Sequence, residues 1–430
     1  MPRALILGGT GLIGRATARR LLASGWEVDL TGRQPGHMPG DLRDAGVGFL
    51  AVDRNDTGQL MTALGAGADL LVDCICYSAE DATRLLPLLE GVGSTVMLSS
   101  KAVYVDAEGR HSNSPTAPCF AGPIGESQPT MRPSNSDYQS REGYGANKVA
   151  AELVLLENDH PVSVLRPSKV HGVAAARPRE WVFVKRVLDQ RPVLLLAHRG
   201  AGVDHPTAAA NVASLIEVAA AVPGQRILNI ADPDSPSGLE ISRTIAAQLG
   251  HVWEEVLLDD DANETLGRHP WERPHPVILD MSAALSLGYT PAGDYATTVA
   301  DEVDWLVSIS EKGPSAELPP DVDGEYFTSM FDYGAEDRYL YANARRSPQS
   351  VDAEPRPLSG SGQLVEAVVR EAKVRGARKL SLRVLGNNVV ARELYARCGF
   401  VIEGVLRDEF LLDRHYVDGV LMARSLIDGS

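Results

Sequence analysis

The chain has 430 residues, enough for two or three domains, and its 44% apolar and 23% charged residues are ordinary for a globular protein. Its 41 basic and 57 acidic side chains give a net charge of 41 − 57 = −16, which argues against binding to a nucleic-acid backbone. No apolar run approaches the roughly 20 residues of a membrane span, and the N-terminal stretch does not have the pattern of a signal peptide. We therefore expect a cytoplasmic protein that binds neither nucleic acid nor membrane.

The cysteines also indicate a protein of a reducing compartment. Four scattered cysteines are too few for a disulfide framework, and no Cys/His cluster has the spacing of a zinc site. We expect free thiols in a reducing compartment and no bound metal.

The first part of the chain alternates between apolar stretches and helical patterns. Strands are predicted at residues 3–9, 27–33, 70–77 and 94–100, and helices at 14–25 and 81–91. This alternation is typical of an α/β fold with a doubly wound parallel sheet and helices on both faces. Further along, we predict a helix at 298–310, a strand at 379–385, a helix at 391–399 and then two short strands.

Three glycines, Gly8, Gly11 and Gly14, separate the first predicted strand from the first helix. Glycine there permits a tight turn, close approach of backbone N–H groups to a pyrophosphate, and close packing of the helix on the sheet. The helix N-terminus then favours the anion. The motif predicts a dinucleotide site, although a plain strand–turn–helix corner can carry the same glycines.

The end of the second predicted strand gives the next indication. Sites for NAD commonly place an acidic residue there to bind the ribose 2′-hydroxyl. Here the residues are Thr31, Gly32 and Arg33. A guanidinium suits a 2′-phosphate, so we predict NADP rather than NAD, with an arginine in a solvated turn as the alternative.

Tyr144 and Lys148 lie four residues apart and therefore share one face of a predicted helix. A free tyrosine, with a pKa of about 10, is a poor base at neutral pH. A nearby ammonium and a cationic nicotinamide ring both favour the phenolate form. The phenolate can then exchange a proton with a substrate hydroxyl while hydride moves to or from the cofactor.

Four stretches occur in an order that resembles the extended short-chain dehydrogenase/reductase family, the NAD(P)-dependent epimerases, dehydratases and reductases. They are GGTGLIG at 8–14, SSKAVY at 99–104, YGANK at 144–148 and LRPSKVHG at 165–172. The resemblance covers about the first three quarters of the chain. It implies a Rossmann-type domain, a smaller substrate lobe, a small-molecule substrate that is often a nucleotide-diphosphate sugar, and a homodimer.

The resemblance also implies roles for single residues. Ser100 would be the catalytic hydroxyl, Tyr144 the acid/base and Lys148 the lysine that holds the cofactor ribose. The cofactor would be bound by Gly8, Thr10, Gly11, Leu12, Ile13, Gly14, Arg33, Asp53 and Lys148, with Asp53 at the adenine.

The sequence departs from the family at several places. Lys101 and Ala102 occupy the positions of the Asp-Glu pair of the sugar 4,6-dehydratases, so we do not expect that dehydration. Cys76 and Tyr77 replace small residues and would crowd the nicotinamide side, and Asn211 replaces a usual aspartate, so the substrate could differ from a common nucleotide sugar. The candidates for substrate contact, with packing or surface roles as the alternative, are His171, His205, His269 and His275.

The C-terminal stretch from residue 360 resembles the GNAT N-acyltransferase family. The turn formed by Gly360, Ser361 and Gly362 at a helix N-terminus implies a site for the pyrophosphate of acetyl-CoA. The resemblance further implies that Asn388 contacts coenzyme A and that Tyr395 protonates the leaving thiolate.

This second match is incomplete. Pro357 stands where the family usually has Gln or Arg, with Arg356 one residue away. Residues 311–357 are proline-rich and acidic, and they do not show the strands that would build the acceptor side. Either another surface supplies that side, or the fragment serves packing or dimerisation.

We predict a dinucleotide-binding domain at 1–166, a substrate lobe with C-terminal packing helices at 167–345, a linker at 346–360 and a partial GNAT-like domain at 361–430. Three functions are consistent with these patterns. They are an NAD(P)-dependent oxidoreductase or epimerase, a bifunctional enzyme that also acetylates an amine, and a non-catalytic dinucleotide-binding sensor or scaffold. The tyrosine–lysine pair favours an enzyme, and reduction is not separated from epimerisation because both begin with hydride transfer.

Overall fold

The computed structural model describes residues 1–259, 266–311, 324–344, 360–375, 377–386, 388–412 and 415–426. The chain divides into two compact units, Met1–Asp332 and Tyr333–Ser430, and each has its own hydrophobic core. Within the described ranges, none of the helices combines the length and the apolar character that crossing a bilayer requires.

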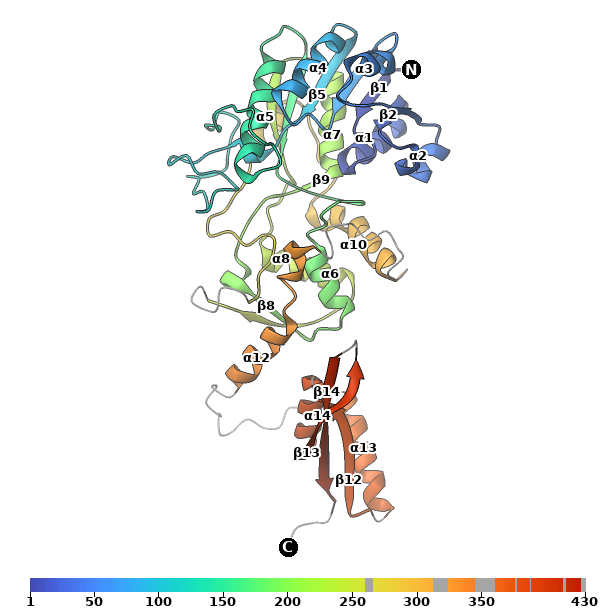
Figure 1. The fold of residues 1–430 in the computed structure, drawn as a ribbon, viewed down its shortest axis with the longest axis vertical. Helices are drawn as coiled ribbons and strands as arrows, with labels where there is room; N and C mark the ends of the chain where they lie inside the picture. Colours follow the sequence, from blue (N-terminus) through green and yellow to red (C-terminus); the bar gives the residue numbers. More distant parts are fainter. Residues whose placement is uncertain are drawn as a thin grey trace. The chain divides into compact units, whose positions relative to one another are not determined.

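The first unit is built on a seven-stranded sheet in the order β10-β6-β5-β4-β1-β2-β3 (Figure 1). Its strands are β1 Arg3–Leu7, β2 Glu27–Gly32, β3 Gly48–Ala51, β4 Ala68–Asp73, β5 Val92–Leu98, β6 Val162–Pro167 and β10 Arg226–Ile230. Every neighbouring pair is parallel. The order grows outward from β1 in both directions, which confirms the predicted doubly wound α/β fold.

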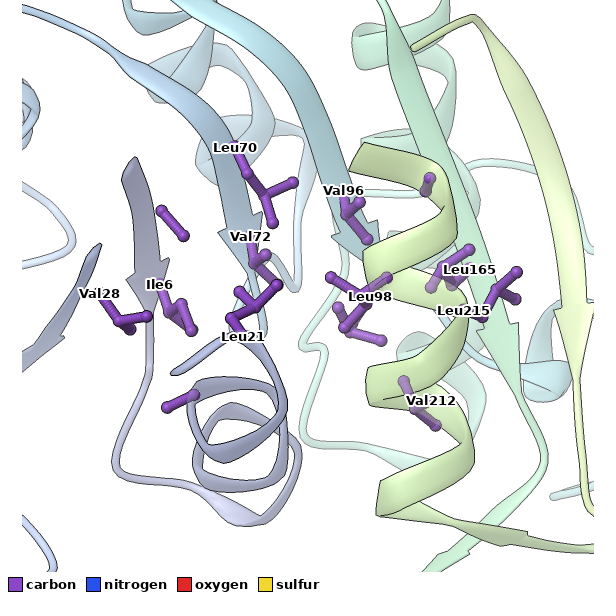
Figure 2. Close-up of a cluster of buried hydrophobic side chains, with 14 of the residues drawn as sticks. Ile6, Leu21, Val28, Leu70, Val72, Val96, Leu98, Leu165, Val212 and Leu215 are labelled. Atoms are coloured by element: carbon purple, nitrogen blue, oxygen red, sulfur yellow. The ribbon is translucent and has the colours of Figure 1, made fainter. Parts of the chain in front are cut away.

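Helices cover both faces of this sheet. The helices of this part are α1 Leu12–Ala23, α2 Gly40–Asp44, α3 Thr57–Leu64, α4 Ala79–Leu89, α5 Arg141–Leu156 and α7 Ala209–Ala221, with 3-10 turns η1 Pro35–His37 and η2 Lys101–Val103. Ala4 and Ile6 of β1 pack into the layer that contains residues of α1 and α7, shown in Figure 2, whereas Leu5 and Leu7 pack with residues of α3, α4 and α5. A strand buried on both faces needs apolar residues throughout, which explains the continuous run in β1.

The fourth strand is shorter than predicted. We expected it to continue to residue 77, but β4 ends at Asp73. The carboxylate of Asp73 accepts a hydrogen bond from the backbone N–H of Ile75 at 2.9 Å and turns the chain. Ser78 and Asp81 then form a capping box at the start of α4.

The remainder of the first unit forms a lobe with its own core. Its elements are β7 Lys169–His171, α6 Trp181–Leu188, β8 Val193–Leu196, η3 Ala197–Gly200, β9 Pro206–Ala208, α8 Gly238–Gln248, β11 Glu254–Leu257, α9 Ser282–Ser286, α10 Tyr295–Glu311 and α11 Glu325–Thr328. Strand β7 pairs with β9, and β8 pairs with β11. Aromatic residues including Phe183, Trp271 and Phe327 form the core of the lobe. The helix predicted at 298–310 is confirmed within α10.

The second unit contains α12 Tyr333–Ala344, α13 Gly360–Val374, β12 Lys379–Leu385, α14 Val389–Arg397, β13 Val401–Leu412 and β14 His415–Ser425. The strands form an antiparallel sheet in the order β12-β14-β13. The prediction of two short final strands was wrong, because β13 and β14 have 12 and 11 residues. The charged residues at 407–409 coincide with a shift of register rather than with the end of the strand. Arg356, Pro357 and residues 346–359 of the predicted linker lie outside the described residues.

Candidate active site

The glycine-rich turn joins β1 to α1 and has little space for side chains. Gly8 has a φ of +73°, which favours glycine. A Cβ on Gly14 would lie 2.6 Å from the Cα of Gly9, so α1 approaches the turn closely. By contrast, a Cβ on Gly11 would meet one atom, the Gly8 carbonyl oxygen, at 3.4 Å. Gly11 therefore borders open space at the N-terminus of α1.

A cavity of about 650 Å³ opens above this turn. Five of the predicted cofactor residues line it: Gly8, Thr10, Gly11, Arg33 and Asp53. Leu12, Ile13 and Gly14 form the first turn of α1, and of these Leu12 lines a second cavity of about 480 Å³ instead.

The side chains around the cavity fit an anionic dinucleotide. The first turn of α1 contains no acidic residue that would oppose an anion at the helix N-terminus. Arg33 is exposed where β2 ends. Asp53 accepts a hydrogen bond from the backbone N–H of Asn55 at 2.9 Å, which fixes its carboxylate at the rim.

Tyr144 and Lys148 lie near the N-terminus of α5, and Lys148 is deeply buried. Its Nζ donates hydrogen bonds to the backbone carbonyls of Cys76 and Leu98, at 2.7 and 2.8 Å. It also lies 6.0 Å from the centroid of the Tyr144 ring. The lysine thus joins α5 to the segments that follow β4 and end β5.

Tyr77 forms a wall between Lys148 and the cavity. The Nζ of Lys148 lies 4.5 Å from the centroid of the Tyr77 ring, and that ring stacks on Tyr138 with centroids 5.3 Å apart. Both tyrosines line the cavity of about 650 Å³. Burial, and next the neighbouring Tyr144, raises the pKa of Tyr77 to about 12, so its phenol is neutral at physiological pH.

Ser100 follows β5 and caps η2, where its Oγ accepts a hydrogen bond from the backbone N–H of Ala102 at 3.1 Å. Helix α5 approaches this turn so closely that a Cβ on Gly145 would lie 2.4 Å from the carbonyl oxygen of Ala102. Gly145 directly follows Tyr144, so the structure brings the segments of Ser100 and Tyr144 together.

A buried cluster of cations surrounds Asp204 next to this turn. Lys101 forms an ion pair with Asp204, and Lys169 and Arg273 each lie 2.9 Å from the same carboxylate. Burial, followed by the charges of Arg273 and Arg179, lowers the pKa of Lys101 well below its ordinary value. Burial, followed by the charge of Arg179, likewise lowers the pKa of Lys169, so three basic side chains that are costly to charge share one carboxylate.

The remaining predicted residues of the lobe are mostly bound within the protein. Asn211 is buried and donates to Asp232 and to the carbonyl of Gly293, at 2.8 and 2.9 Å. His205 bonds the carbonyl of Asp232 at 2.8 Å, and burial lowers the pKa of His269 to about 3. Hydrogen bonds within the lobe therefore hold Asn211 and His205 in place. His171 is also buried, whereas Cys76 is a buried free thiol and His275 is exposed.

In the second unit, the glycines and the two polar candidates lie at helix ends. The predicted glycine turn is the first turn of α13, which begins at Gly360 and includes Gly362. Asn388 caps α14 by accepting from the backbone N–H of Ala391 at 3.0 Å. Tyr395 packs on Phe400 with ring centroids 5.8 Å apart.

Sequence reasoning did not find Tyr138, Lys169, Arg273 or Asp204. Each meets its partner across a long separation in the chain, and an isolated charge or aromatic residue carries no periodic signal. Lys169 alone had an indication, because it lies within the stretch LRPSKVHG.

Residues 4–205 match the family model of the NAD dependent epimerase/dehydratase family. A search of curated proteins gave no match. The matched stretch contains β2 to β6, nearly all of β1, α1 to α5 and the predicted Ser100, Tyr144 and Lys148.

Solved structures share the fold. A dTDP-glucose 4,6-dehydratase from Bacillus anthracis in complex with NAD has 17% identity and a TM-score of 0.54, and the alignment covers 72% of this chain and 98% of that one. A Thermus thermophilus UDP-glucose 4-epimerase complex with NAD has 20% identity and a TM-score of 0.52, over 70% and 98%. A UDP-N-acetylglucosamine 4-epimerase from Bacillus cereus has 17% identity and a TM-score of 0.56, over 72% and 100%.

Proposed function

We propose that the chain is a nicotinamide dinucleotide-dependent oxidoreductase or epimerase that acts on a hydroxyl or carbonyl of a sugar-nucleotide-like molecule. The observation that carries the proposal is the approach of α5 to the turn after β5, which brings the segments of Tyr144 and Ser100 together beside Lys148. The family match over 4–205 supports it.

Each residue has a distinct role in this proposal. When bound, the nicotinamide ring accepts or donates a hydride. The Ser100 hydroxyl holds the reacting oxygen of the substrate, and the Tyr144 phenolate takes its proton, or the Tyr144 phenol returns it in the reverse direction. The ammonium of Lys148 stabilises the phenolate form and, once Tyr77 moves aside, can donate to the cofactor ribose.

The cation cluster supports an anionic substrate. Lys101, Lys169 and Arg273 place three basic side chains around the single carboxylate of Asp204, and an anion next to them would favour their charged forms. Phosphate groups are ligands that such cations bind strongly. The solved relatives named above act on dTDP- and UDP-sugars, which carry a diphosphate. Arg33 supports NADP as the cofactor, although the first two of those relatives hold NAD.

The catalytic assignment is tested by replacing Tyr144 with phenylalanine. UDP-glucose and dTDP-glucose are incubated with the protein and NADP⁺ or NAD⁺, and products are followed by absorbance and by NMR. We expect Tyr144→Phe to lower kcat by about 100-fold or more without weakening cofactor binding. Tyr138→Phe, which keeps the stacked ring, should stay within about threefold of the wild type. Unchanged turnover in Tyr144→Phe would overturn the assignment, and cofactor binding without turnover on any sugar would favour a sensor.

A second activity, acyl transfer from acetyl-CoA, is favoured by the C-terminal unit. Gly360 begins α13, and the backbone N–H groups at that helix N-terminus can donate to a pyrophosphate. The resemblance assigns contact with coenzyme A to Asn388, which caps α14. We expect acetyl-CoA to bind and Gly362→Trp to abolish that binding, with NADPH binding unchanged. If the variant binds acetyl-CoA as tightly as the wild type, or if the wild type does not bind it, the C-terminal unit would have a structural role only.

A further inference from the structure

His171, Glu180 and Glu302 form a buried group in the lobe, and none of them is part of the lining described for the cavity of about 650 Å³. His171 belongs to β7, Glu180 precedes α6, and Glu302 lies on α10. Their side chains are 2%, 2% and 0% exposed, so water does not screen their charges. One potential ligand atom from each residue lies within 4.8 Å of the others.

Among the residues that the structure describes, two atoms of this group have no hydrogen-bond partner as long as both glutamates are ionised. They are Nδ1 of His171 and Oε1 of Glu302, and both are fully buried. The other oxygen of Glu302 accepts from the backbone N–H of Gly172 at 2.6 Å and lies 3.8 Å from His171 Nδ1. Buried polar atoms in proteins almost always have a hydrogen-bond partner. A nitrogen and a carboxylate oxygen without one, in the same buried group, therefore indicate a site for a ligand.

The surrounding contacts orient His171 as a metal ligand. Its Nε2 lies 2.8 Å from the buried carboxylate of Asp232, and an ionised carboxylate only accepts, so in the neutral imidazole the hydrogen is on Nε2 and the lone pair is on Nδ1. A histidine that binds a metal through one ring nitrogen usually donates a hydrogen bond from the other nitrogen to a carboxylate or a carbonyl. The hydroxyl of Tyr295 donates a hydrogen bond to the carboxylate of Glu180 at 3.3 Å.

The charges of the group also favour a cation. Two buried carboxylates side by side are stable only if a proton or a metal ion neutralises part of their charge. A route for an ion exists, because His171 and Gly172 line the cavity of about 480 Å³.

We propose that His171 Nδ1, Glu180 and Glu302 bind a divalent transition-metal ion, with water or a small ligand in the fourth position. An imidazole nitrogen with two carboxylate oxygens suits Zn²⁺ and its neighbours better than Mg²⁺ or Ca²⁺, which prefer oxygen ligands alone. The three ligands come from β7, the start of α6 and α10, so the sequence shows no zinc-like spacing, and the site was missed.

Zinc binding to the full chain tests the proposal. The protein is stripped with EDTA, exchanged into chelator-free buffer and titrated with Zn²⁺ by calorimetry, and its Tm is recorded with and without the ion. We expect one equivalent to bind and the Tm to rise by at least about 2 °C. Glu302→Gln, which keeps the size of the side chain, should lose both effects. His198→Gln, which removes a more exposed histidine 3.1 Å from Glu272, should keep them.

Two binding results and one spectroscopic result would overturn the proposal. If the wild type binds no zinc and Glu302→Gln is as stable as the wild type, the two glutamates share a proton instead. If Glu302→Gln still binds one equivalent, the metal lies elsewhere. X-ray absorption of the zinc-loaded wild type does not depend on a variant that folds. It should show one imidazole with oxygen neighbours at about 2.0–2.2 Å, and a spectrum without imidazole scattering would contradict the site.

Discussion

The Nζ atom of Lys148 lies 4.5 Å from the centroid of the Tyr77 ring and donates to two backbone carbonyls, so the lysine predicted to hold the cofactor ribose is covered. A cofactor that reaches Lys148 must displace Tyr77 from this contact. Tyr77 therefore separates the cavity above the glycine-rich turn from the catalytic end of α5.

Replacing Tyr77 should improve cofactor binding. In Tyr77→Ala the cation–π contact, worth about 0.5–2 kcal/mol, no longer has to be broken, so the Kd for NADPH should fall by about twofold to thirtyfold. Calorimetric titration measures this change. Tyr138→Ala removes the outer ring but leaves the contact with Lys148, and its Kd should change less. Weaker binding in Tyr77→Ala would mean that this ring contacts the cofactor directly.

The role of Arg33 predicts a change in cofactor preference. Arg33→Ser removes the guanidinium at the end of β2, so the Kd for NADPH should rise by about tenfold while that for NADH stays within about twofold. Fluorescence titration with both nucleotides gives the two values. Arg43→Ser, on α2 and outside the cavity lining, is the matched control. An equal loss for both nucleotides would assign Arg33 to the diphosphate or to folding.

Two glycines of the same turn should respond differently to alanine. A Cβ on Gly14 collides with the backbone of Gly9, so Gly14→Ala should cost about 1–3 kcal/mol of unfolding free energy. Gly11→Ala has room in the protein, so its Tm should stay near that of the wild type while NADPH binding weakens strongly. Gly36→Ala, with no atom within 4 Å of its Cβ, controls for both. Normal NADPH binding by Gly11→Ala would remove the cofactor from the helix N-terminus.

The lowered pKa of Asp106 predicts that the folded protein loses stability in acid. Burial alone would raise its pKa, but the backbone N–H groups of Cys119 and Arg110 and the Arg110 guanidinium together lower it to about 2. Because the pKa is lower in the folded state, the carboxylate stabilises the fold fully above pH about 4, and this contribution disappears as the pH falls toward 2. The Tm of Asp106→Asn should therefore be lower than that of the wild type at pH 7, and the two should converge in acid.

Tryptophan fluorescence can follow this unfolding, because Trp26, Trp181, Trp253, Trp271 and Trp305 all belong to the first unit. Asp44→Asn, an exposed acid on α2, is the control. A difference between Asp106→Asn and the wild type that does not shrink below pH 4 would contradict the assignment.

The fold and parts of the site could be predicted because their signals are local. The continuous apolar run of β1, the glycines after it and the four-residue spacing of Tyr144 and Lys148 each lie within one short window. Contacts between distant segments could not be predicted. The stacking of Tyr77 on Tyr138 and the cations around Asp204 depend on how loops meet after the sheet has formed.

In the C-terminal unit too, local patterns could be predicted and pairing between strands could not. The strand predicted at 379–385 and the helix at 391–399 were recognised from their patterns, and β12 and α14 occupy those places. The length of the final hairpin was missed, because pairing of β13 with β14 carries the strand through a charged stretch that would end an isolated one.

The most direct test of the proposed function is a thermal-shift titration of the purified chain with NADPH and NADH. A ligand that binds only the native state raises Tm as its concentration increases. We predict a rise with both nucleotides that is larger with NADPH, and a much smaller rise in Gly11→Ala. No rise with either nucleotide would contradict the central claim that the cavity above Gly11 is a nicotinamide dinucleotide site.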